Sequence, residues 1–489
     1  MNNTPTQAAL AAHRYGLGEA SLATVGDDAV GWLQAQIGPA EPQRGEGLAS
    51  GVEGVKRYAQ FIQRLQRAGQ AAAATAGAVA ASPADGLSMS ASTEQNFVEH
   101  FRTLVQADVR ARLSTAALST RPFNERLALF WANHFTVSMA KASARGIVGA
   151  FEREAIRPHI AGSFEGLLKA STHHAGMLRY LDNDRSAGPD SPLVCRRAGR
   201  TTNDNPQAPR GLNENLAREV LELHTLGVAG GGSGFGGWGG YTQTDVTEFA
   251  RVLTGWRVPV ALLMDAPPGA TATRFEAAWH QPGSKTVIGK SYAEGPEALD
   301  AVLHDLALHP STARFVCSKL ARHFVADEPP PALVAKLVAA WQRSGGDLPS
   351  IYRALVEAPE AWAPQAAKLK SPEEFVISTA RVLQLGEQAF ARVADGGVGP
   401  LGQRVQAAPS PAGWPDRAEE WLGPDAVWKR VEWASRVADR VGRRTDARAI
   451  AQASLGPLLH EETARQIARA ADGPQALTLL LLAPEFQRR

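Results

Sequence analysis

This chain has few cysteines, a small net charge and no long apolar run, and each of these absences argues against a class of protein. Two cysteines in 489 residues, Cys195 and Cys317, cannot form a disulfide framework and have no metal-ligand spacing. A formal charge of +2 gives no general attraction to nucleic acid or to an anionic membrane. The best apolar run, residues 476–483, is far shorter than the ~18 residues that span a bilayer. We therefore expect no nucleic-acid partner and no membrane insertion.

Several familiar signatures are also missing. The chain contains no HExxH, GxSxG or CxxC pattern. The usual sequence signatures of zincins, α/β-hydrolases and thioredoxin-like proteins are therefore absent. Residues 1–17 lack the basic segment followed by an apolar segment that marks a secretory leader. The sequence as given therefore predicts a cytoplasmic protein, with a periplasmic or exported one as the alternative.

Helical periodicity dominates what remains. Apolar residues recur with the 3.6-residue period of amphipathic helices along most of the chain. Two short segments, residues 273–278 and 285–288, are predicted to pair as a hairpin. We expect an all-α fold, a large multi-helix array of which an α/α-toroid is one form, with at most one small β-hairpin. The predicted helices are residues 28–37, 55–70, 93–117, 124–141, 147–160, 163–171, 213–227, 244–256, 296–308, 311–325, 331–343, 348–358, 372–385, 425–441, 461–471 and 474–482.

Two irregular segments bear on organisation. Residues 396–421, rich in Gly, Pro and Trp, are the best candidate boundary between a main helical domain, 1–395, and a C-terminal helical segment, 396–489. The same segment is compatible with a single domain. Residues 230–240 hold eight glycines in eleven residues, but no strand precedes them and no Gly-Lys-Ser/Thr follows. They therefore indicate a flexible lid or an insertion, not a phosphate-binding loop.

Residues 213–227 form the most polar of the predicted helices. Glu214, Arg218 and Glu222 line up opposite its apolar face, and Glu–Arg pairs four residues apart stabilise a helix by about 0.2–0.5 kcal/mol each. A solvated, salt-bridged face is therefore one interpretation. Asparagines at the helix start and the glycine-rich loop behind it favour a ligand site instead, because ligands gather beside mobile loops.

Under the functional interpretation, Glu219 and Glu222 are the acid and base, one with a pKa raised by burial. Arg218 would keep its partner carboxylate ionised, and His224 would relay protons. Carboxylates together with Asn, Trp and Tyr suit a carbohydrate substrate, because aromatic rings stack on sugars and a carboxylate pair cleaves acetals. The predicted substrate-binding residues are Asp182, Asn183, Asn213, Glu214, Tyr241, Asp245, Trp131 and Trp256.

Histidines supply an alternative chemistry. His134, His224 and His280 with a glutamate could ligate zinc, iron or copper, which would make the protein a metal-dependent oxidase or hydroxylase with a divalent or transition metal. Nothing in their spacing demands a metal, and the Glu-x-x-His signature of di-iron proteins is absent. A lone histidine on the apolar helix around His134 is more often a satisfied core residue.

Short segments along nearly the whole chain form a set that resembles a known family. They are residues 12–18, 130–138, 175–183, 213–227, 241–256, 309–313, 345–348, 370–374 and 483–487. These segments resemble the bacterial "domain of unknown function eighteen hundred" family. The chain departs from the family pattern at residues 175–178, Ala-Gly-Met-Leu where the family has Pro-Ala-Met-Leu, and in a longer glycine loop before Tyr241.

The resemblance implies a helical protein that is often exported and often accompanies a sulfatase-like partner protein. It includes the polar positions of residues 213–227, which favours the functional interpretation of that helix. We therefore expect an enzyme, a hydrolase or lyase acting on a carbohydrate or cell-envelope polymer. A non-catalytic scaffold that binds a partner protein is the remaining alternative.

Overall fold

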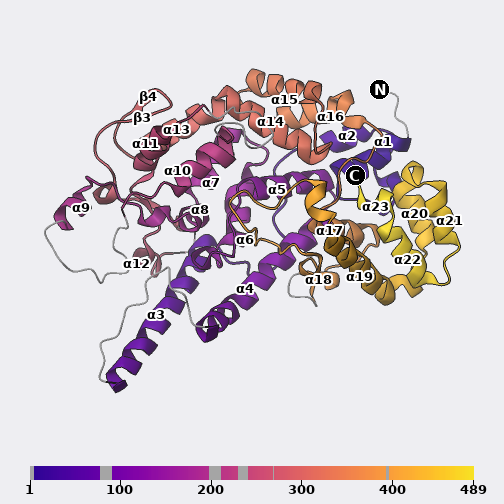
Figure 1. Cartoon of the computed structure of the whole chain (residues 1–489), viewed down its shortest axis with the longest axis horizontal. Coiled ribbons are helices and arrows are strands. Elements are labelled where there is room, and N and C mark those ends of the chain that lie inside the picture. Colours follow the sequence, from indigo (N-terminus) through magenta and orange to yellow (C-terminus); the bar gives the residue numbers. More distant parts are fainter. Residues whose placement is uncertain (1–4, 77–90, 198–210, 229–239, 268, 392–395) are drawn as a thin grey trace.

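The computed structural model describes residues 5–76, 91–197, 211–228, 240–267, 269–391 and 396–489. The chain is mostly helical, as predicted, with small strands on one side (Figure 1). No helix in these ranges combines the length and apolarity needed to cross a membrane. Most of the glycine-rich segment, residues 230–239, lies outside the described residues, so its predicted role as a lid stays a prediction.

The helices have the following bounds. The first half of the chain contains α1 (Pro5–Leu10), α2 (Ala29–Gln34), α3 (Gly51–Ala76), α4 (Ala91–Leu118), α5 (Pro122–His134), α6 (Val148–Phe151), α7 (Phe164–His173), α8 (Ala175–Tyr180), α9 (Pro192–Arg197), α10 (Asn215–Glu219) and α11 (Gln243–Leu253). The second half contains α12 (Val260–Leu263), α13 (Glu297–Leu308), α14 (Pro310–Phe324), α15 (Pro331–Ser344), α16 (Leu348–Glu357), α17 (Pro372–Val382), α18 (Gln388–Ala391), α19 (Pro424–Val441), α20 (Ala447–Leu455), α21 (Glu461–Ala468), α22 (Gly473–Leu482) and α23 (Pro484–Gln487).

Local start signals set many of these bounds. Thr242 and Asp245 form a capping box, in which each side chain accepts a hydrogen bond from the other residue's backbone N–H. Proline occupies the first position of α15, where its missing N–H costs nothing. The predicted helix 124–141 is too long, because α5 ends at His134. The Thr136 hydroxyl donates to the Asn133 carbonyl oxygen at 2.7 Å, just beyond the helix end.

The predicted hairpin has the wrong partners. Strand β2 (Arg274–Phe275) pairs with β1 (Trp256–Arg257), and β3 (Lys285–Val287) pairs with β4 (Lys290–Tyr292). Each pairing is antiparallel, so the described chain holds two small sheets. Ile288 and Gly289 both have positive φ, which is the backbone of the tightest two-residue hairpin turn. This turn folds β3 back on the residues that follow it.

Three short π-helices place polar side chains in the interior. They are η1 (Ala11–Tyr15), η4 (Glu152–Ile156) and η7 (Val220–Thr225). Arg14, Glu152 and His224 on these segments are each at most 2% exposed. A π-helical turn carries one extra residue and occurs frequently at functional sites. The predicted helix 213–227 is thus α10 followed by η7.

One large hydrophobic cluster joins the beginning and the end of the chain, while a small second cluster lies between α3 and α4. The buried residues of the large cluster run from Ala8 to Phe486 without a break into separate halves. The His13 side chain hydrogen-bonds the Ser454 carbonyl oxygen at 2.8 Å, and Leu369 pairs with Arg488 in a backbone bridge. Figure 1 accordingly shows α1 and α2 beside the C-terminal helices. The core therefore fixes α5, α14 and α17 against one another at the centre of the molecule.

Candidate active site in a central cavity

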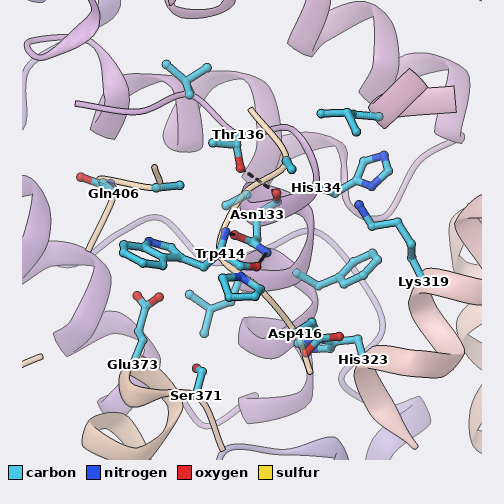
Figure 2. A pocket seen from close by; sticks show the side chains of 18 of the residues that line it. Asn133, His134, Thr136, Lys319, His323, Ser371, Glu373, Gln406, Trp414 and Asp416 are labelled. Atoms are coloured by element: carbon cyan, nitrogen blue, oxygen red, sulfur yellow. Dashed lines mark hydrogen bonds and ion pairs between the residues drawn. The ribbon is translucent and has the colours of Figure 1, made fainter. Parts of the chain in front are cut away.

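A cavity of about 350 Å³ lies where α5, α14 and α17 meet. Its walls are largely apolar, with a few charged groups among them, which is the usual composition of a small-molecule site. Residues Leu223 and Val228, at the end of the polar helix predicted from the sequence, form part of one wall. The segment from Gln403 to Asp416, here called the strap, covers another wall (Figure 2).

Helix α14 presents one polar face to the cavity. Phe315, Lys319, Arg322 and His323 all line it, at the three- and four-residue spacing of a single helix face. Figure 2 shows the Lys319 side chain reaching from α14 toward His134. Its Nζ lies 5.5 Å from the centroid of the Phe315 ring. Within the described ranges Lys319 makes no hydrogen bond or ion pair.

The environment of Lys319 lowers the pKa of its amine toward neutral pH. Burial lowers the pKa of Lys319 to about 8, although the Asp416 carboxylate opposes that shift. A group with this pKa exchanges protons readily near neutral pH, which is the property required of a general acid or base.

His134 and His224 are neutral neighbours of this amine. Burial, and then the Lys319 charge, lowers the pKa of His134 well below its usual range. Burial, again with Lys319, lowers the pKa of His224 to about 3. The His134 Nε2 lies 3.1 Å from the His224 carbonyl oxygen and donates to it. Because neither ring carries a charge, neither can serve as a counterion for a bound anion.

A second polar group is formed by His323, on the same face of α14 as Lys319, and by Asp416 of the strap. His323 Nδ1 is 3.4 Å from Asp416 Oδ1, and Lys368 Nζ is also 3.4 Å from that oxygen. Burial alone would raise the pKa of Asp416, but His323 and Lys368 lower it to about 2. Asp416 is therefore ionised and orients the His323 ring.

The other carboxylates of the cavity are held in ion pairs. Glu373 pairs with Arg112 at 2.6 Å, and Arg112 also pairs with Glu152 at 2.5 Å. Glu374 pairs with Arg126 and, at 2.9 Å, with Arg489. Buried carboxylates in such pairs are structural anchors, because freeing one would leave an uncompensated charge.

The strap is clamped onto α5 by one side chain. Asn133 Nδ2 donates to the Trp414 carbonyl oxygen at 2.9 Å, and the Trp414 N–H donates to Asn133 Oδ1 at 2.8 Å. Gly413 precedes Trp414 with φ +85°, and a Cβ at Gly413 would lie only 2.6 Å from the Asn133 carbonyl oxygen. Glycine is thus required for the close approach of strap and helix.

Glu219 and Glu222, the predicted acid and base, do not line this cavity. Both are partly exposed, and neither makes an ion pair or hydrogen bond within the described part of the chain. Burial, and then the Glu222 charge, raises the pKa of Glu219 to about 7. Glu219 also helps to raise the pKa of Tyr180 to about 12, after burial itself. The two carboxylates form a separate polar group beside Tyr180.

The remaining residues of the predicted helix support its start. Glu214 Oε2 accepts hydrogen bonds from Gln243 at 2.7 Å and from Arg218 at 3.2 Å. Asn213 Oδ1 accepts from the Asn215 N–H at 2.8 Å, as a cap does. Arg218 is therefore tied to Glu214 rather than to Glu219 or Glu222.

Several predicted substrate-binding residues have structural partners. Asp182 pairs with Lys141 at 2.6 Å, and Asn183 donates to the Leu253 carbonyl oxygen at 3.1 Å. The Trp131 ring is buried and donates from Nε1 to the Tyr352 hydroxyl at 2.6 Å. Asp245 belongs to the capping box of α11 and also accepts from the Ile288 N–H. None of these four lines the cavity.

The aromatic residues Tyr241 and Trp256 are partly exposed. Trp256 packs against His173, with ring centroids 4.4 Å apart. Neither Tyr241 nor Trp256 lines the cavity, so their predicted contact with a substrate would belong to a different surface.

The three histidines considered as metal ligands do not come together. His134 and His224 have ring centroids 6.2 Å apart, whereas His280 hydrogen-bonds the Thr254 carbonyl oxygen and the Lys285 amine. In the part of the chain that the structure describes, no three His, Cys, Asp or Glu side chains are positioned to hold a metal. The metal interpretation gains no support from this geometry.

The sequence patterns did not identify Lys319, His323, Asp416 or Trp414 as site residues. Of the predicted residues, His134 is the one that lines the cavity within the described chain. Lys319 and His323 stand four residues apart on α14, and that spacing was a usable signal. Asp416 and Trp414 gave no such signal, because the tertiary fold alone brings the strap to α14.

Comparison with known families supports the resemblance noted from the sequence. A family model described as "Protein of unknown function (DUF1800)" matches residues 10–488, which is nearly the whole chain. Comparisons with curated proteins and with solved structures give no match. The chain therefore belongs to the DUF1800 family.

Proposed function

We propose that this protein is an enzyme, a hydrolase or lyase that acts by acid–base catalysis on a carbohydrate or cell-envelope component. The proposed active site is the central cavity, and Lys319 is the group that takes up and releases the proton. The observation that carries this proposal is an amine with a pKa of about 8 at the cavity wall, without an ion-pair partner in the described chain.

The cavity favours a lyase over a glycosidase with two carboxylates. Glycosidases of that kind need one carboxyl group to donate a proton and a second to attack or to activate water. Here Glu373 and Glu374 are held by arginines, and Asp416 is held by His323 and Lys368. Lys319 is the group left able to exchange a proton, and an amine base suits proton abstraction from carbon.

A sugar-sized substrate fits the walls of the cavity. Phe130, Phe315 and Trp414 provide aromatic surface, on which sugar rings stack. A volume of about 350 Å³ lies at the lower end of the range for small-molecule sites. The cavity would hold a monomer or a chain end rather than the middle of a polymer.

Activity of Lys319 variants tests the proposal. The purified chain would be incubated with acidic and neutral polysaccharides and with cell-wall fragments in oxygen-18 water, and the products would be analysed by mass spectrometry. A hydrolase adds the heavy oxygen at the bond that it breaks, whereas a lyase leaves a double bond there without adding water. We expect Lys319→Met and Lys319→Arg to lower kcat/KM by roughly 100-fold or more, the usual effect of losing a general base.

Matched variants separate the two candidate sites. Lys169→Met removes a lysine of α7 that pairs with Glu165 on the same helix, away from the cavity. This variant should leave activity unchanged. Full activity of a folded Lys319→Met protein would refute the proposal. Loss of activity in Glu219→Gln with retention in Lys319→Met would move the reaction to the carboxylates beside Tyr180. An inactive chain that binds a protein partner would instead favour the scaffold alternative.

A further inference from the structure

The Lys319 amine combines three properties that a nucleophilic lysine needs. Its side chain is partly exposed within a cavity, so a ligand can reach it. It has no hydrogen-bonding or ion-pairing partner among the described residues that would hold the nitrogen lone pair or the proton. Apolar side chains contribute to its surroundings: the Phe315 ring is 5.5 Å away, and Phe130 and Leu223 also line the cavity. Desolvation of this kind activates lysine as a nucleophile.

Neighbouring groups keep the amine available. The adjacent His134 and His224 rings are neutral, so they carry no negative charge that would hold the amine in its protonated form. The nearest influential carboxylate, Asp416, is held by His323 and Lys368. With a pKa of about 8, Lys319 is about half unprotonated at pH 8. An ordinary lysine is roughly 0.4% unprotonated at that pH.

We propose that Lys319 is a nucleophile that forms an imine with the carbonyl carbon of an aldehyde or ketone bound in the cavity. The inference rests on the proposed function, since both require the Lys319 amine to be the reacting group. It names the substrate class more closely as a carbonyl compound, such as the open-chain form of a sugar. An imine withdraws electrons from the neighbouring carbon, which suits a lyase that breaks a bond at that position.

The step balances without an oxidant or a reductant. The nitrogen lone pair forms a bond to the carbonyl carbon, and a proton moves from nitrogen to the former carbonyl oxygen. The remaining proton on nitrogen then passes to the resulting hydroxyl group, which leaves as water, so that the carbon–oxygen bond breaks while the nitrogen lone pair forms the C=N bond.

Borohydride trapping tests the inference. The full chain would be incubated at pH 8 with hydroxyacetone, a neutral ketone, or with pyruvate, a ketone that carries a carboxylate. Sodium borohydride would then deliver hydride to the imine carbon, leaving a stable secondary amine on the lysine. Peptide mass spectrometry would locate the adduct. We expect labelling of Lys319 at least about tenfold above Lys336, an exposed lysine paired with Glu360, given their different fractions of free amine.

The outcomes separate this inference from the proposed function. Adducts on Lys319 with either ketone, lost in Lys319→Arg and after unfolding in urea, support it. Stronger labelling by pyruvate than by hydroxyacetone would add that the substrate is anionic. Labelling of Lys319 no greater than that of Lys336 with both ketones would overturn the imine. If Lys319→Met still abolished activity, the proposed function would stand, with Lys319 acting as a base alone.

Discussion

At the scale of single residues, the buried titratable groups are of two kinds: those held in ion pairs and those without an ion-pair partner in the described chain. Buried acids and bases such as Glu374, Asp416 and Arg126 sit in ion pairs, where they hold the fold. Lys319 and Glu219 are desolvated without such partners in the described chain, and their pKa values move toward neutrality. Groups of the second kind can change protonation state during a reaction, so they are the candidates for chemistry.

Glu219 should make stability depend on pH. Its pKa is raised from the usual range to about 7 in the folded chain. The folded state then holds the proton more tightly than the unfolded state, so stability falls as pH rises from about 4.5 to 7. Glu219→Gln removes that loss. We expect the variant to match the parent at pH 4.5 and to unfold at a higher urea concentration at pH 8.

Glu214, the residue that precedes α10, is a control, because its effect on stability should depend on pH in the opposite direction. Hydrogen bonds from Thr247, and then from Gln243, lower the pKa of Glu214, so its contribution is present above the unfolded pKa and lost as pH falls. Glu214→Gln should therefore cost stability at pH 8. If Glu219→Gln raised the urea midpoint of unfolding equally at pH 4.5 and pH 8, the raised pKa of Glu219 would be contradicted. The gain in stability would then not depend on ionisation of Glu219.

At the scale of elements, the strap determines whether the cavity is closed. Asn133→Ala removes both hydrogen bonds to Trp414, a loss of about 1–3 kcal/mol in total. We expect faster hydrogen exchange over residues 403–416 and a lower yield of trapped Lys319. Gly413→Ala should act in the same way, since its new Cβ would displace the strap from α5.

A distant hydrogen-bond deletion is the control for the strap. Ser143→Ala loses a hydrogen bond to the Arg179 carbonyl oxygen and should leave exchange in the strap unchanged. Unchanged exchange in Asn133→Ala would show that other contacts, such as the hydrogen bond from Ser138 to the Ala408 carbonyl oxygen, hold the strap by themselves.

Most of the long helices could be predicted from the sequence because their signals are local, whereas α20 (Ala447–Leu455) was not predicted. Apolar spacing and caps such as Thr242 with Asp245 lie within a few residues of one another. The π-helix η7 could not be predicted, because one extra residue in a turn leaves the apolar pattern of residues 213–227 almost unchanged. The pairing of β3 with β4 was missed because Ile288 adopts a positive φ that β-branched residues rarely take.

The candidate site was predictable only in part, for a related reason. His134 was identified by its place in an apolar helix, whereas its partners in the cavity come from α14 and from the strap. Asp416 follows His323 by nearly a hundred residues, and no periodicity connects positions so far apart. The polar row on residues 213–227 drew attention to Glu219 because its residues are close in sequence.

At the scale of the whole molecule, the shared core predicts a single unfolding transition. Tyr15, Leu127, Trp433 and Leu480 belong to one buried cluster, so the C-terminal helices have no separate core of their own. We expect circular dichroism and tryptophan fluorescence to give the same urea midpoint, and we expect a chain cut after residue 395 not to fold. Two separated transitions, with residues 396–489 unfolding alone, would instead support the boundary considered from the sequence.

The clamp between Asn133 and Trp414 joins positions 281 residues apart. Contacts of such long range form late in folding, after most of the loop-closure entropy has been lost. Until they form, Lys319 is surrounded by water and keeps the proton of an ordinary lysine. A nascent or proteolytically opened chain would therefore carry an inert side chain at this position. Reactivity at Lys319 thus indicates that the contact between Asn133 and Trp414 has formed.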